Sequence, residues 1–158
     1  MKKYFYFIFL FVLAACSSNE EEVDPREAFY REAIIGSWAI NTIEFDDQIF
    51  VYDHTEGCEK DLFQFYNEEG KEFEFEELVV LNCPNCAECA ISQSILRWEL
   101  IGNKINFYFG EQYILQYEIV SVTDTTFSYR LRLDVDNDGE LDEITVNADY
   151  YDPYNNFN

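Results

Sequence analysis

Basic residues are scarce in this chain: ten Lys and Arg stand against 32 Asp and Glu, which gives a net charge of −22 at pH 7. That balance argues against nucleic-acid binding, which needs clustered Lys and Arg for its phosphate contacts. It also argues against a chain that lies flat on an anionic membrane. The acids do not form a disordered tail, because 15 Phe and 12 Tyr bring the aromatic content to 18%. We therefore expect one folded domain with an acidic surface.

Residues that support catalysis are also few. The chain has one histidine, His54, and it lacks a metal-binding histidine pair, a nucleophile elbow and a phosphate-binding loop. Acidic pairs are too frequent in this chain for their proximity to indicate a catalytic pair. We therefore expect no enzymatic activity and interpret His54 as an exposed loop residue. A metal-ligand role for His54 beside Cys58 is the alternative.

A long apolar run is present at the start of the chain, where Tyr4–Val12 follows two lysines. The run is too short for a permanent membrane helix, which needs about 20 apolar residues, and it is typical of a secretory signal. The Leu-Ala-Ala-Cys sequence ending at Cys16 resembles the lipobox of bacterial lipoproteins. The resemblance implies a signal peptide over residues 1–15, cleavage before Cys16, and lipid on the sulfur and amine of Cys16. The alternative is an ordinary signal peptide with a chance cysteine.

Residues 16–26 are polar and acidic without periodicity, which predicts a tether. Ser17 is not the aspartate that retains many bacterial lipoproteins at the inner membrane. The run Glu20-Glu21-Glu22 resembles the surface-export signals of some Gram-negative lipoproteins, although a solvated spacer explains it as well. We therefore expect a protein anchored to the outer membrane by its lipid, on the periplasmic face or the cell surface.

A short helix is predicted over Pro25–Ala33. Asp24 has the chemistry of an N-cap, proline is favoured at the first helical position, and Glu27 is placed as a capping-box partner. Phe29 and Ala33 fall on one face of this helix and should point toward the core.

After Gly36 the hydrophobic period changes to two, which is the strand period. Eight to ten short strands joined by turns follow in the sequential pattern of a meander. Closing a meander removes its edges, so the pattern predicts an all-β antiparallel barrel of about eight strands over residues 27–150, with a tail over 151–158. A β-sandwich is the alternative. The strand segments run over 38–43, 49–52, 62–66, 73–81, 95–100, 105–109, 113–119, 127–133 and 144–148.

Several segments resemble, in order and spacing, the lipocalin-like domains of bacterial lipoproteins, which belong to the calycin type of barrel. They are Gly36-Ser37-Trp38, Cys58 to Phe65 with Gly70, Arg97 to Ile105, Tyr117 to Val120, and Thr125 to Phe127. The resemblance implies an eight-stranded barrel able to hold a small apolar ligand. The cysteine loop and the acidic loop near Asp136 depart from the family pattern.

Inward aromatic side chains are the candidates for contact with such a ligand, and they are equally able to fill the core. They are Trp38, Phe73, Phe75, Phe107, Phe109, Tyr117, Phe127 and Tyr129. Our first hypothesis is a lipid-anchored envelope protein that binds a small apolar ligand in or at the mouth of the barrel. The alternative is a structural or interaction lipoprotein with a filled barrel, which acts through its acidic surface. A cavity of about 300 Å³ or more favours the first, and a solid core favours the second.

Four cysteines remain once Cys16 is given to lipid, namely Cys58, Cys83, Cys86 and Cys89. An even set in an oxidising compartment predicts disulfides. A zinc site, an iron–sulfur site and a redox dithiol are the alternatives. Four cysteines allow three pairings, and we favour Cys83–Cys86 with Cys58–Cys89.

Alternating acids occupy the stretch Asp134–Asp142, which is a candidate calcium loop. Its expected ligands are Asp134, Asp136, Asp138, the backbone carbonyl of Glu140, and Asp142. The stretch resembles the first nine positions of an EF-hand loop but departs at the twelfth, where Thr145 replaces glutamate. A plain hairpin turn is the alternative, because Asn-Asp-Gly is good turn chemistry. Calcium is therefore the one cofactor that the sequence suggests.

Overall fold

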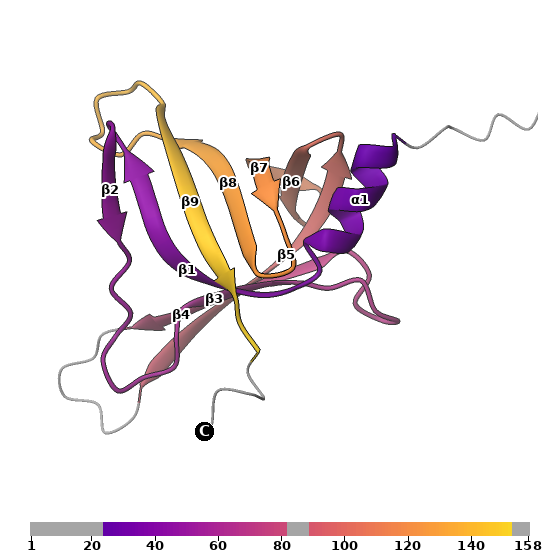
Figure 1. Cartoon of the computed structure of the whole chain (residues 1–158), viewed down its shortest axis with the longest axis horizontal. Helices are drawn as coiled ribbons and strands as arrows, with labels where there is room; N and C mark the ends of the chain where they lie inside the picture. Colours follow the sequence, from indigo (N-terminus) through magenta and orange to yellow (C-terminus); the bar gives the residue numbers. More distant parts are fainter. Residues whose placement is uncertain (1–23, 82–88, 153–158) are drawn as a thin grey trace, which may run out of the picture.

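The computed structural model describes residues 24–81 and 89–152. The predicted signal peptide, Cys16, Cys83, Cys86 and the end of the tail lie outside the described residues. The described part contains one helix and nine strands (Figure 1). They are α1 (Pro25–Ala33), β1 (Gly36–Phe45), β2 (Gln48–Val51), β3 (Leu62–Phe65), β4 (Glu74–Leu81), β5 (Ala90–Ile101), β6 (Lys104–Phe109), β7 (Gln112–Val122), β8 (Thr126–Leu133) and β9 (Asp142–Tyr150).

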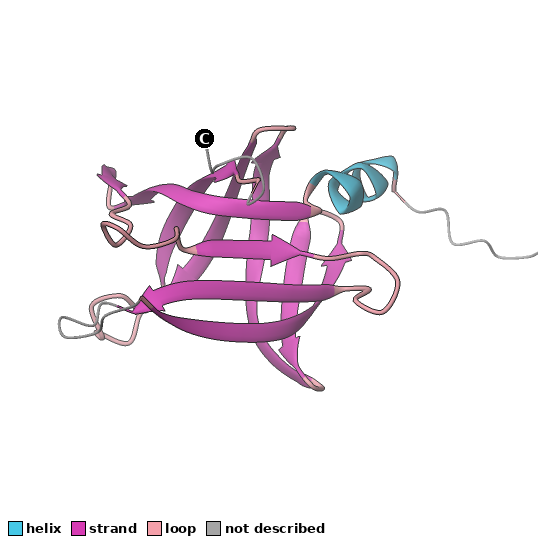
Figure 2. Ribbon diagram, turned by 90° about the horizontal axis from the view of Figure 1, so that it is seen from below, coloured by secondary structure: helices cyan, strands magenta, loops and turns pink. Residues whose placement is uncertain are grey.

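The strands form one antiparallel sheet in the order β2-β1-β3-β4-β5-β6-β7-β8-β9, and a further β1–β9 pairing closes it. β2 and β3 share one edge of β1: Gly36–Ala39 pair with β3, and Thr42–Phe45 pair with β2. The nine strands therefore occupy eight positions around the barrel, whose strands Figure 2 shows from the side. The predicted meander barrel is confirmed, and the sandwich alternative is wrong.

The helix has the predicted bounds, and it begins at Pro25 because its start signals are local. The Asp24 carboxylate accepts a hydrogen bond from the backbone N–H of Arg26 at 2.8 Å, and proline follows the cap. The predicted inner face is wrong in one residue. Phe29 is 56% exposed, and Tyr30 packs against the core together with Ala33. At nine residues, α1 has neither the length nor the apolar content of a membrane span, and no other helix occurs in the described ranges.

Glu27 links the helix to the barrel rather than completing a capping box. Its carboxylate accepts hydrogen bonds from the backbone N–H of Gly102 at 2.9 Å and from Arg31 at 2.9 Å. Beyond the helix, the carbonyl of Ile34 accepts a hydrogen bond from the indole N–H of Trp38 at 2.9 Å. These contacts hold α1 across one end of the barrel (Figures 1 and 2).

Gly36 makes the sharp entry from the helix into β1. Its φ of +134° is a conformation that side-chain-bearing residues rarely adopt, and a Cβ at this position would lie 3.0 Å from the ring of Tyr150. The glycine therefore lets the last residue of β9 pack beside the first residue of β1, where the barrel closes.

Candidate functional site

Aromatic rings fill the barrel interior. Phe107 is fully buried, and its ring centroid lies 4.6 Å from those of both Phe75 and Tyr117. Tyr117 in turn stacks on Tyr129 at 4.0 Å. Six of the eight predicted interior aromatics are buried, namely Trp38, Phe75, Phe107, Tyr117, Phe127 and Tyr129. Their rings contact one another directly, so side chains of the protein occupy the axis of the barrel.

Two predicted interior residues lie elsewhere. Phe109 is 69% exposed because β6 ends there, at the β6–β7 turn, and its register with β5 stops at Tyr108. Phe73 precedes β4, has a φ of +61°, and is only partly buried. Its ring packs against Trp98 at 5.4 Å and lies under the guanidinium of Arg31. Strand alternation does not apply to a residue outside the strand, which is why the period of two misplaces Phe73.

Glu77 is an acid inside the barrel that the sequence patterns did not predict. It follows the buried Phe75 by two residues on β4, so both side chains point to the same face of the sheet. Burial raises the pKa of the Glu77 carboxyl, and the neighbouring charge of Asp61 raises it further. Burial, followed by the charge of Glu77, also raises the pKa of Tyr117. The sequence did contain a signal for this position, because Glu77 continues the spacing of two residues set by Phe73 and Phe75.

Asp61 organises the loop between β2 and β3. Its buried carboxylate accepts hydrogen bonds from the backbone N–H of Val80 at 2.5 Å and from the hydroxyl of Tyr52 at 2.7 Å. Burial and the hydrogen bond to Asp61 raise the pKa of Tyr52 to about 12. This network fastens the loop against the far half of β4, beyond the stretch that pairs with β3.

His54 belongs to the same network, so its interpretation as an exposed loop residue is wrong. One ring nitrogen accepts from the N–H of Asp61 at 3.1 Å, and the other lies 2.9 Å from the carbonyl of Ile40. A carbonyl only accepts, so Nε2 carries the proton and Nδ1 is the acceptor. Both nitrogens of His54 are therefore engaged by the backbone, which does not fit the alternative of a metal ligand beside Cys58.

We expect Glu77→Gln to stabilise the protein at neutral pH. Because the pKa of Glu77 is raised above the unfolded value of 4.5, the folded state loses stability as the pH rises through that raised pKa. The substitution removes this loss and should increase the melting temperature by on the order of 2 °C at pH 7, and by almost nothing near pH 3.5. Thermal unfolding at both pH values is the measurement. Glu111→Gln at an exposed position is the matched control. An equal rise in melting temperature in the two variants would show that the effect comes from the change in net charge and not from the burial of Glu77.

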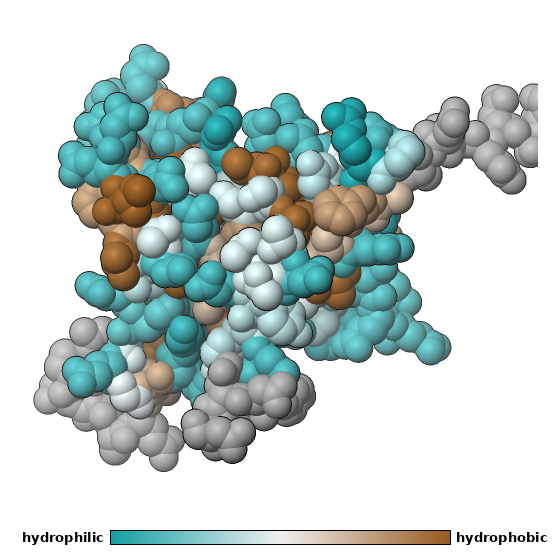
Figure 3. Space-filling model, in the orientation of Figure 1, coloured by the Kyte–Doolittle hydropathy of each residue, from teal (hydrophilic) through white to brown (hydrophobic). Residues whose placement is uncertain are grey.

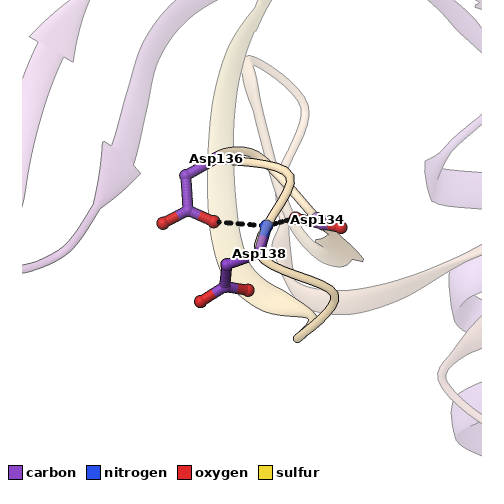
Figure 4. A group of neighbouring side chains, drawn as sticks. All are labelled: Asp134, Asp136 and Asp138. Carbon is purple, nitrogen blue, oxygen red and sulfur yellow. Dashed lines mark hydrogen bonds between the residues drawn. The ribbon is translucent and has the colours of Figure 1, made fainter.

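The predicted calcium ligands converge in part. Asp134, Asp136 and Asp138 each offer a carboxylate oxygen, and these oxygens lie within 4.8 Å of one another (Figure 4). The backbone N–H of Asp138 donates to the Asp134 and Asp136 carboxylates at 3.1 Å each. The carboxylate of Asp142 instead accepts from the N–H of Val135 at 3.0 Å and is not one of the three. The Glu140 N–H donates to Asp138 at 2.8 Å, and the converging group consists of the Asp134, Asp136 and Asp138 carboxylates.

A disulfide joins Cys58, in the loop after β2, to Cys89, which directly precedes β5. The two Cα atoms are 5.8 Å apart, within the usual range for a disulfide. This is one of the two predicted pairs. The other predicted pair, Cys83–Cys86, lies outside the described residues.

The predicted Cys83–Cys86 disulfide can be tested by counting free thiols. If Cys83 and Cys86 are also joined, the mature protein denatured without reductant should show no free thiol in a thiol-reactive dye assay. Full reduction should then expose Cys58, Cys83, Cys86 and Cys89, because the lipid predicted on Cys16 would block that thiol. Two free thiols before reduction would contradict the second disulfide, and four together with bound zinc would contradict both.

No protein-family model matches the chain, and no curated protein matches it. A crystal structure of an uncharacterized protein from Bacteroides eggerthii is similar to this chain, with a TM-score of 0.48 and 10% sequence identity. The similarity covers 75% of this chain and 99% of the other.

Proposed function

We propose that this protein is a non-enzymatic lipoprotein of the cell envelope, held at the outer membrane by lipid on Cys16, whose filled barrel presents an acidic exterior to a partner. The observation that carries the proposal is the aromatic packing of the interior. Phe65, Phe107 and Phe127 are fully buried at the centre of the barrel, and the ring of Phe65 lies 6.1 Å and 6.0 Å from those of the other two. A barrel of this size is small enough to be filled by side chains.

The charge of the exterior supports the same proposal. Acids exceed bases by 22 over the whole chain, and several of the few basic side chains are held in ion pairs. Arg130 and Arg132 both lie against Glu143, at 3.1 Å and 3.6 Å, and Arg31 pairs with Glu27. The remaining acids give the surface a strong negative potential, which steers cationic partners and repels anionic ones.

Retention of a small molecule tests this proposal against the first hypothesis, an apolar ligand in or at the mouth of the barrel. Native mass spectrometry of protein from its own cells should show the mass of the lipidated chain alone. Titration with the apolar dye N-phenyl-1-naphthylamine should show no saturable fluorescence. Phe65→Ala, checked for folding by near-UV circular dichroism, is the control because it opens space in the core and should gain dye binding. A retained ligand, or saturable dye binding by the wild type, would establish the ligand-binding alternative.

Calcium binding at the Asp134–Asp138 loop is a second candidate, supported by the convergence of three carboxylates within 4.8 Å. Hard cations prefer oxygen ligands grouped in this way, and the carboxylates repel one another without a cation. An affinity of about 10⁻⁴ to 10⁻³ M is expected, as for other extracellular modules.

Melting temperatures test the calcium candidate. Millimolar calcium should raise the melting temperature of the wild type, and Asp136→Asn with Asp138→Asn should abolish the rise. The control pair Glu68→Gln with Glu69→Gln removes the same charge from the turn before β4 and should keep it. Equal shifts from calcium and magnesium in all three proteins would mean diffuse screening, and the site would be rejected.

A further inference from the structure

β2 is an exposed edge strand. It pairs with β1 along one side, and its other side has no strand partner among residues 24–81 and 89–152. All four of its residues are exposed, and Ile49, Phe50 and Val51 expose 69%, 48% and 72% of their surfaces. Figure 3 shows apolar side chains over β2, at the left edge of the molecule, amid hydrophilic ones. Three consecutive large apolar residues at a free edge form a template for another strand.

The register identifies which backbone groups of β2 are free. The turn Asp46–Asp47 has φ values of +50° and +58°, as in a type I′ hairpin, whose flanking residues Phe45 and Gln48 form a hydrogen-bonded pair. Hydrogen-bonded pairs then recur at every second residue, in agreement with the bond of 2.8 Å from the Tyr52 N–H to the Asn41 carbonyl. The N–H and C=O groups of Ile49 and Val51 therefore point away from β1, toward the free edge.

Apart from its length of four residues, this edge lacks the features that keep exposed strands from pairing. The segment Gln48-Ile49-Phe50-Val51 contains no lysine, proline or glycine, and its register with β1 has no bulge. Ile49, Phe50 and Val51 have high strand propensity. The edge is thus suited to receive a strand by its backbone, and its exposed side chains can discriminate between strands.

The charges around β2 indicate which strand it accepts. Asp46 and Asp47 precede the strand, and Asp53 follows it closely. Glu44 also lines a hollow of about 320 Å³ beside its first residues, together with Glu143, whose charge Arg130 and Arg132 already balance. Both ends of the edge are therefore negative, which favours a segment with basic residues at its ends. A second copy of this chain would bring the same acids against them, and like charges so placed are repulsive.

We propose that β2 docks an extended segment of a partner protein, with alternating apolar residues flanked by Lys or Arg, as an added strand of the barrel wall. The inference rests on the proposed function, an exterior that works by protein contact, and it names the surface and the chemistry of the partner. Backbone hydrogen bonds to Ile49 and Val51 supply the affinity, and the flanking acids supply the preference for a basic segment.

The test uses the lipidated protein in detergent and a fluorescent peptide of sequence Lys-Val-Thr-Val-Thr-Val-Lys, measured by fluorescence anisotropy. We expect saturable binding with a dissociation constant on the order of 10–100 µM, which weakens as salt is added. A peptide with Glu in place of both Lys should bind at least about tenfold more weakly. Failure of the Lys peptide to bind, or equal binding of the two peptides, would overturn the proposal.

A matched pair of variants localises the binding to the edge. Val51→Pro removes the outward N–H without touching a hydrogen bond to β1, whereas Val51→Thr keeps that N–H. We expect Val51→Pro to weaken binding by about tenfold or more and Val51→Thr by less than about threefold. Asp46→Asn with Asp47→Asn should weaken binding and flatten its salt dependence, since asparagine tolerates a positive φ. Equal affinities of the proline and threonine variants would place the peptide elsewhere and overturn the assignment to β2.

Other occupants of the edge give different results. A concentration-dependent dimer in analytical ultracentrifugation that Val51→Pro abolishes would make a second copy the occupant and overturn the proposal. So would peptide binding that appears only after residues 153–158 are removed, because the chain itself would then occupy the edge. If the protein binds the peptide and also retains an apolar ligand, the filled barrel is wrong and the β2 proposal stands. If it binds neither peptide nor ligand, the β2 proposal is wrong and the filled barrel stands.

Discussion

Replacing Phe107 with Ala should lower the free energy of unfolding by about 3–5 kcal/mol, the usual loss for a phenylalanine removed from a packed core. Phe109→Ala, two residues along the same strand, should change it by less than about 0.5 kcal/mol. The two phenylalanines share β6 and the same phase, yet Phe107 is fully buried and Phe109 is 69% exposed. Urea denaturation of both variants and the wild type is the measurement.

The contrast between the two variants depends on the rings around Phe107. Phe75 and Tyr117 both lie 4.6 Å from it, so truncation leaves a cavity that neighbouring strands of a closed barrel cannot collapse to fill. Phe107→Leu should recover about half of the loss, because leucine restores part of the volume. A loss below about 1 kcal/mol for Phe107→Ala would show that the core is loosely packed, contrary to the filled barrel.

Cys16→Ser should transfer the protein from the membrane fraction to the soluble fraction. The lipid predicted on Cys16 needs the thiol, and each buried methylene of a lipid chain contributes about 0.8 kcal/mol to membrane binding. Within residues 24–81 and 89–152, no helix has the length and hydropathy of a membrane span. Fractionation followed by immunoblotting is the measurement, and Ser17→Ala is the control that should stay with the membranes. A Cys16→Ser protein that still sediments with membranes would contradict the predicted anchor.

The parts of the fold that sequence patterns predicted are those set by local chemistry. The start of α1 follows from a cap and a proline that act within one turn of Asp24. The strands follow from a period of two that each segment shows by itself, as in Ile144, Val146 and Ala148 of β9. Closure could be expected because a meander with that many strands has few other ways to hide its edges.

The parts that were missed depend on contacts between distant segments. Whether a residue in phase with the core is buried depends on the neighbouring strand, and β5 does not pair with Phe109. Glu77 is the exception among the missed residues, because its phase with Phe75 on β4 was visible in the sequence. The environment of His54 depends on Asp61 and on the carbonyl of Ile40, which no local pattern connects. The division of one barrel position between β2 and β3 likewise has no local signal.

The candidate calcium loop and the cysteines were also predicted only in part. The grouping of Asp134, Asp136 and Asp138 could be predicted from the sequence, because the three residues occupy alternate positions in one tight loop. The engagement of Asp142 by the Val135 N–H did not follow, since it depends on how the loop closes. For the cysteines, spacing alone left three pairings, and the approach of Cys58 to Cys89 arises from the packing of the β2–β3 loop beside the start of β5.

The closure of the barrel by β1 and β9 also determines when the chain can fold. The side chain of Asn41 on β1 donates to Asp149 on β9, across 108 positions of sequence. One edge of β1 therefore has no partner until β9, the last strand, has been synthesised. At about 5–20 residues per second, the time between synthesis of Asn41 and of Asp149 is several seconds or more. Contacts of such long range also make folding slow. The barrel of this chain can therefore close only when nearly all of it has been made, and a chain that is not yet closed suits passage through a membrane translocation channel.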